Sequence, residues 1–250
     1  MGRSAKIIAR VRDHWQLVAL TFLVAAHWHT SVVLPVKILV VFFHELSHAL
    51  AAWGTGGSVE RITLSAQQGG LTMSRGGNAF LIATAGYLGS LLIGMVIFLA
   101  AVRTNADRVI MASLGLVLAL VTAVYFREPF PLTYGGLGAA TMLASAIKLG
   151  HHANDLILRV IGLTSLIYVP FDIFDDTIAR SAQMSDARIL AETFGGSTHL
   201  WGGLWVAASV AAIALCLRFG LGGSSNIPVG FPSASDAAAP RAPRRSAPPG

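Results

Sequence analysis

Five long runs without a charged side chain constrain this chain more than any other feature of its sequence. Asp, Glu, Lys and Arg are absent from residues 16–36, 76–102, 109–126, 129–147 and 193–217. Most of these runs reach the roughly 18–20 residues that an α-helix needs to cross the hydrocarbon core of a bilayer. Backbone groups in lipid must be paired within the protein, and the runs show no polar/apolar alternation. We therefore expect helices rather than barrel strands.

The composition supports a membrane protein and argues against a nucleic-acid binder. Charged residues make up 12% of the chain, about half of the roughly 25% typical of soluble domains. The net charge is +6, and residues 1–13 and 221–250 together contribute most of it. No basic face is therefore left for the folded part to offer to nucleic acid. We expect a multi-pass integral protein in contact with the lipid bilayer, in a plasma membrane of the bacterial type.

The chain divides into three parts. Residues 1–13 form a basic N-terminal arm, residues 14–220 a transmembrane domain, and residues 221–250 a tail of Pro, Ala, Ser and Arg expected to be disordered. Within the domain we expect helices at about 14–30, 34–54, 78–102, 108–126, 132–150, 156–178 and 199–219, which gives six or seven spans. Between Gly54 and Gly77, short apolar stretches flank a Gln-Gln-Gly-Gly turn and predict a hairpin. The predicted fold is thus an all-α polytopic membrane protein with a short β-hairpin. A polar connector is expected at 179–198.

The sequence His44-Glu45-Leu46-Ser47-His48, an HExxH motif, carries the strongest chemical signal. Residues four apart on a helix differ by about 40° in azimuth, so the two imidazoles point into one site. Two neutral His nitrogens suit Zn²⁺, and the glutamate between them can take a proton from a metal-bound water. An ionisable Glu inside an apolar helix also needs a functional or structural reason. The alternative is a satisfied polar cluster that only holds helices together.

Three downstream carboxylates are candidates for the third metal ligand. Asp172, Asp175 and Asp176 have i, i+3, i+4 spacing on one helical face at the end of an apolar run. Because three carboxylates repel one another, a nearby cation is the simplest compensation. Asp172 lies deepest in the apolar run and is the first choice, while Asp175 and Asp176 are alternates or acceptors that orient the histidines. The alternative is an acidic helix end at the membrane surface.

These segments together resemble those of a known family, the M50B-like peptidases of the site-2-protease group of intramembrane zinc metalloproteases. The resemblance covers roughly residues 35–220 and rests on PVKILVVFFHELSHALAAWGTGG, GGLT, AGYLGS, YVPFDIFDDTIARS and SDA.

The resemblance implies zinc ligation by His44 and His48 and catalysis by Glu45. The Asp cluster stands where the group supplies its carboxylate ligand, although Phe171-Asp172-Ile173-Phe174 replaces the group's Asn-Pro/Leu-Asp-Gly type motif. The hairpin at 59–73 resembles a β segment that guides an unwound substrate in that group.

The function predicted from these features is intramembrane zinc endopeptidase activity on membrane-spanning protein substrates. Glu45 would activate a zinc-bound water held at His44, His48 and Asp172. Two other classes remain open. One is a catalytically silent membrane scaffold or chaperone with the same fold. The other is an ion or proton transporter that uses the His/Glu/Asp cluster as its path.

Overall fold

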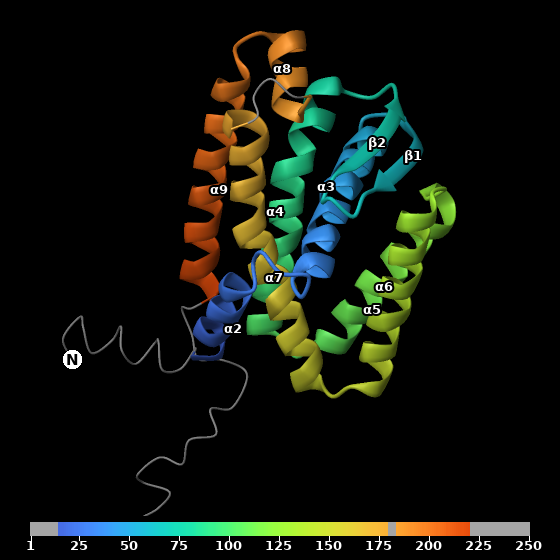
Figure 1. The fold of residues 1–250 in the computed structure, drawn as a ribbon, viewed down its shortest axis with the longest axis vertical. Coiled ribbons are helices and arrows are strands. Elements are labelled where there is room, and N and C mark those ends of the chain that lie inside the picture. The colour runs from blue at the N-terminus through green and yellow to red at the C-terminus, as the bar shows by residue number, and fades with distance from the viewer. Residues whose placement is uncertain (1–14, 180–183, 221–250) are drawn as a thin grey trace, which may run out of the picture.

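The computed structural model of the chain describes residues 15–179 and 184–220 (Figure 1). The basic arm predicted for residues 1–13 and the tail predicted for residues 221–250 lie outside the described residues.

Helices dominate the described structure, as predicted. They are α2 (Trp15–Ala26), α3 (Leu34–Gly54), α4 (Ala79–Arg103), α5 (Asp107–Tyr125), α6 (Pro129–Lys148), α7 (His151–Phe174) with its π-helical continuation η1 (Asp175–Ala179), α8 (Asp186–Phe194) and α9 (Thr198–Gly220). Five spans in the described part of the chain are long and apolar enough to cross a membrane: α3, α4, α5, α7 with η1, and α9. The prediction of an all-α polytopic protein is confirmed. The expected six or seven spans become five, because α2 is short and α6 is less apolar.

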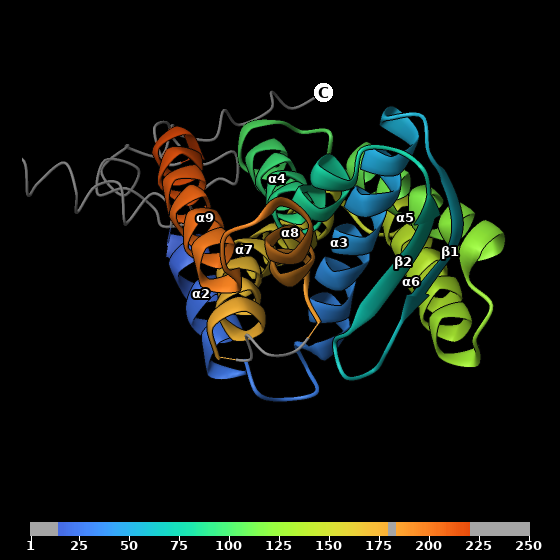
Figure 2. The same ribbon diagram turned by 90° about the horizontal axis from the view of Figure 1, so that it is seen from above.

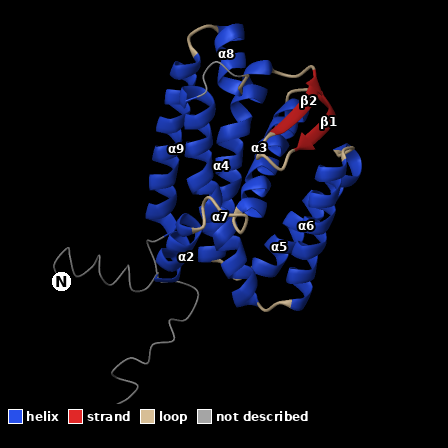
Figure 3. Cartoon of the chain, in the orientation of Figure 1, coloured by secondary structure: helices blue, strands red, loops and turns tan. Residues whose placement is uncertain are grey.

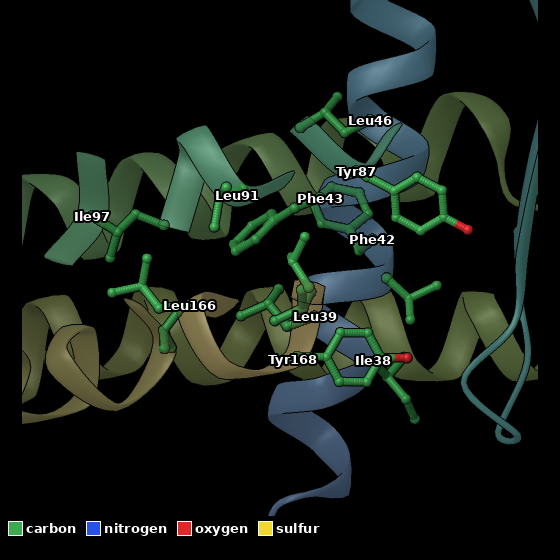
Figure 4. Packing of buried hydrophobic residues seen from close by; sticks show 14 of the residues in the cluster. Ile38, Leu39, Phe42, Phe43, Leu46, Tyr87, Leu91, Ile97, Leu166 and Tyr168 are labelled. Atoms are coloured by element: carbon green, nitrogen blue, oxygen red, sulfur yellow. The ribbon is translucent and has the colours of Figure 1, made fainter. Parts of the chain in front are cut away.

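The helices α3, α4 and α7 form the centre of the bundle, with α9 and α2 on one side and the α5–α6 pair on the other (Figure 1). In the core, Phe42 and Phe43 of α3 belong to one buried cluster with Leu91 of α4 and Leu166 of α7 (Figure 4). The packing is close: a Cβ added at Gly162 of α7 would lie 2.7 Å from the Cβ of a phenylalanine on α4. Tight contact of this kind is how membrane helices associate without a hydrophobic driving force.

The predicted hairpin is confirmed and stands beside α3 (Figure 3). Strand β1 (Ser58–Leu64) pairs antiparallel with β2 (Gly70–Arg75), with Ile62 opposite Thr72 and an irregularity between Val59 and Arg61. Alternation along the strands buries Ile62 and Leu64 and exposes Leu71 and Met73. Arg61 also forms an ion pair with Glu128 at the start of α6, which ties the hairpin to the bundle.

One element differs from the sequence prediction: part of the expected polar connector folds as the helix α8. Ser185 is its N-cap, and its side chain accepts a hydrogen bond from the Arg188 amide at 3.3 Å. Ala187 and Leu190 bury one face of the helix. The sequence pattern predicted a polar connector for 179–198 as a whole, although the spacing of Ala187 and Leu190 fits one face of a helix. Seen from above, α8 lies between α9 and α3 (Figure 2), which brings its first turn to the HExxH motif.

Candidate metal centre

The two histidines of the HExxH motif lie one turn apart on α3, as the helix period predicts. Their ring centroids are 4.6 Å apart. Helix α4 crosses directly against them at Gly86, where an added Cβ would lie 2.4 Å from His44 Nε2 and 2.5 Å from His48 Nε2. Only a glycine at position 86 leaves room for the two ring nitrogens. The backbone of α4 at Gly86 thus lies directly against both Nε2 atoms.

A third ligand atom meets the two imidazoles, and it comes from Asp186 at the start of α8. Its Oδ2 lies 3.0 Å from His44 Nε2 and 3.2 Å from His48 Nε2. Among the described residues, His44, His48 and Asp186 form the group of His, Cys, Asp or Glu side chains whose ligand atoms lie close enough to hold one metal ion. Oδ2 is buried, and no N–H or O–H of a described residue donates to it with hydrogen-bond geometry. The three atoms therefore face a common point.

The charge state of Asp186 suits a ligand. Burial alone would raise the pKa of its carboxyl, but the neighbouring imidazoles, His48 foremost, outweigh that effect and hold the pKa below its usual range. Asp186 is therefore a carboxylate at neutral pH, which is the form that binds a metal.

Glu45 lies beside this group without belonging to it. Its side chain is buried, and the Thr72 hydroxyl of β2 lies 2.7 Å from Glu45 Oε2 and 3.0 Å from the Glu45 carbonyl oxygen. An added Cβ at Gly70 would lie 2.4 Å from Glu45 Oε1. The hairpin therefore positions the glutamate by direct contact. The sequence pattern placed Gly70 in the hairpin turn and Thr72 in the GGLT segment, but it predicted no contact of either with Glu45, because that contact depends on how the hairpin docks against α3.

The orientation of His48 is set by a backbone acceptor. His48 Nδ1 lies 2.7 Å from the Ile82 carbonyl oxygen of α4, so Nδ1 carries the proton and donates it there. With Nδ1 committed to this carbonyl, Nε2 is the ring nitrogen that faces Asp186, at 3.2 Å from Oδ2. A carbonyl behind a ligating imidazole is a common arrangement in metal sites, because it fixes both tautomer and ring plane.

The three aspartates predicted as ligand candidates lie elsewhere. The carboxylate that meets the histidines is that of Asp186, and the structure does not bring Asp172 into the group. Asp175 is exposed, while Asp176 accepts a hydrogen bond from the Tyr87 hydroxyl at 2.9 Å and lines the cavity described below. The expectation for Asp172 rested on depth along α7. The docking of α8 against α4 and α9 brings a different carboxylate to the pair.

A cavity of about 580 Å³ opens beside the ligand group. Its walls come from α3, α4, β2 and the first turns of α8, and β2 contributes a continuous stretch, Gly70–Ser74. Glu45 and the three converging side chains all line it. A molecule bound in the cavity could therefore contact both Glu45 and the group formed by His44, His48 and Asp186.

A family model described as Peptidase M50B-like matches residues 17–216, four fifths of the chain. The chain belongs to this family. The predicted resemblance is thereby confirmed, and so is the expected setting, because an M50B-like chain with five long apolar helices is a multi-pass integral membrane protein. No curated protein and no solved structure matches the chain.

The donor set of this M50B-like protein fits a zinc ion. Two imidazole nitrogens and one carboxylate oxygen are the ligands of several catalytic zinc sites. The buried Asp186 Oδ2 lacks a hydrogen-bond donor, and the Gly86 position leaves space on the ligand side of both rings. The residues present therefore suit the metal on which peptidases of this family depend.

Proposed function

We propose that this protein is an intramembrane zinc endopeptidase that hydrolyses peptide bonds of membrane-spanning proteins. We assign His44, His48 and Asp186 as the zinc ligands, with Asp186 in place of the aspartate first predicted. The observation that carries the proposal is that Asp186 Oδ2 lies 3.0 Å from His44 Nε2 and 3.2 Å from His48 Nε2, beside the buried Glu45.

Each side chain has a distinct task in this reaction. Zinc, when bound, supplies a Lewis acid that makes water nucleophilic at neutral pH. Glu45 accepts the proton that the attacking water releases and later donates a proton to the leaving amine. Thr72 holds Oε2 of Glu45 in place, and burial of Glu45 keeps bulk water from competing for the proton.

The hairpin supports a substrate in extended form. Among the described residues the sheet has two strands, so one edge of β2 is unpaired, and residues 70–74 of that strand line the cavity. An extended peptide can add to such an edge through main-chain hydrogen bonds. A transmembrane helix offers these groups only after local unwinding, since its own backbone hydrogen bonds otherwise use them.

Zinc analysis and membrane proteomics test the proposal on the full chain. Wild-type protein and Glu45→Gln, purified in detergent, should each hold about one zinc per chain. Cells carrying Glu45→Gln should accumulate intact membrane substrates that wild-type cells cleave. Glu192→Gln makes the same chemical change on an exposed side of α8 and should behave like the wild type.

Two outcomes contradict the proposal. Zinc in both proteins with identical membrane proteomes would favour a catalytically silent scaffold. Purified wild-type protein without zinc would favour a transporter that uses the same cluster as an ion or proton path.

A further inference from the structure

The two histidines of the candidate site are held in different ways. His48 donates Nδ1–H to the Ile82 carbonyl oxygen, which fixes its ring. Among the described residues, no hydrogen bond reaches Nδ1 of His44. The plane of the His44 ring must therefore be fixed by packing.

The packing partner of His44 is Tyr87, which follows Gly86 on α4. The two ring centroids are 4.6 Å apart at an interplanar angle of 81°, an edge-to-face contact. Tyr87 is 2% exposed, and Trp205 of α9 packs on it at 5.1 Å. The tyrosine ring therefore has little freedom, and neither has a histidine ring that lies against it.

The hydroxyl of Tyr87 is anchored as well. It donates a hydrogen bond of 2.9 Å to Asp176 Oδ2 on η1. This π-helical turn is firmly placed, because Thr177 is buried and an added Cβ at Gly202 of α9 would overlap its side chain. Isolated π turns are uncommon and often occur at functional sites. A chain of contacts thus runs from η1 through the tyrosine to the first histidine.

We propose that Tyr87 is a positioning residue that fixes the His44 ring for metal binding, and that Asp176 acts through the Tyr87 hydroxyl. The inference rests on the proposed zinc site and assigns the acidic end of α7 and η1 a part in it. An oriented ligand ring binds tighter because less of its rotational freedom is lost on coordination. Loss of such an orienting partner typically costs about 10–100-fold in metal affinity.

Cobalt titration tests this inference without relying on catalysis. Co²⁺ accepts the same ligands as zinc, and its visible absorption reports the coordination geometry. We expect Tyr87→Leu, which removes the ring, to bind Co²⁺ roughly 10–100-fold more weakly and with an altered spectrum. Tyr87→Phe keeps the ring and should retain the wild-type spectrum, with a measurable loss of affinity that reaches at most about tenfold, because the link to Asp176 is lost.

A matched control and a double variant sharpen the test. Tyr134→Phe removes a tyrosine hydroxyl that donates to the Pro35 carbonyl oxygen at 2.7 Å, away from the cavity, and should leave Co²⁺ binding unchanged. Asp176→Ala should weaken binding as Tyr87→Phe does, and the double variant should be no weaker than the weaker single variant. Additive losses would overturn the assignment that Asp176 acts through the tyrosine.

The inference and the proposed function fail in different ways. Wild-type affinity and spectrum in a folded Tyr87→Leu protein would overturn the inference alone. If that variant does not fold, wild-type affinity in both Tyr87→Phe and Asp176→Ala overturns it. A wild-type protein that takes up neither Co²⁺ nor zinc would overturn the proposed metal site, and the inference with it.

Discussion

The glycine at position 86 provides the sharpest test of the geometry. An alanine Cβ there would lie 2.4 Å from His44 Nε2 and 2.5 Å from His48 Nε2. Both Cβ–Nε2 separations are about 1 Å shorter than the 3.4 Å at which ordinary van der Waals contact begins. Neither ring can yield freely, because Tyr87 packs on one and the Ile82 carbonyl binds the other. The added methyl group must therefore push at least one ligand atom away.

A displacement of this size exceeds what zinc coordination tolerates. Zinc–nitrogen distances are about 2.0–2.1 Å, and a working site holds them within roughly 0.2 Å. A shift of about 1 Å is several times that tolerance. We therefore expect Gly86→Ala to lower zinc affinity by at least about 100-fold, more than the loss of an orienting partner costs. Competition with a chromophoric chelator on the detergent-purified protein measures this affinity.

Two other glycine variants separate the metal effect from helix packing. Gly203→Ala on α9 meets no atom within 4 Å and should keep zinc and stability, since alanine favours a helix interior. Gly89→Ala would place a Cβ 2.4 Å from the Oγ of Ser47 on α3. It should lower the thermal unfolding midpoint while the folded protein keeps most of its zinc affinity. A folded Gly86→Ala protein with wild-type zinc affinity would refute the geometric reasoning.

Three further predictions concern the ligand assignment, the Glu45 contact and a buried ion pair of α7. Asp186→Asn should remove stoichiometric zinc, whereas Asp172→Asn should keep it. Metal analysis of both purified proteins measures this, and zinc lost from Asp172→Asn but kept by Asp186→Asn would contradict the ligand assignment. Thr72→Val should keep zinc and lower the rate of substrate cleavage by about tenfold, because Glu45 loses its orienting hydroxyl; full activity would show that the contact is incidental. Asp155→Asn should destabilise the protein by about 3–5 kcal/mol, because its 2.8 Å ion-pair partner on α7 is a fully buried arginine. Thermal unfolding measures that loss, and an unchanged midpoint would show that the buried charge is otherwise compensated.

Several features of this protein could be predicted from local sequence. The charge-free runs predicted helices close to the observed bounds, because the cost of unpaired backbone in lipid leaves few other solutions. The spacing of His44 and His48 predicted that both rings point to one side, since four residues nearly complete a helical turn. The hairpin could be predicted from its apolar stretches and turn. Each of these properties depends on residues within one or two turns of one another.

The tertiary structure alone decided what completes the site. Asp186 is 138 positions beyond His48, and its place beside the two histidines depends on α8 docking against α4 and α9. Depth in an apolar run favoured Asp172, but burial along one helix does not determine which carboxylate faces a neighbouring helix. Gly86 and Thr72 likewise act through contacts with α3 that no local pattern encodes. The sequence by itself predicted the pair of histidines on one helical face, the glutamate beside them and the membrane setting, because those follow from helix period and solvation. Packing between distant segments decided the third ligand candidate and the residues that hold the ligands in place.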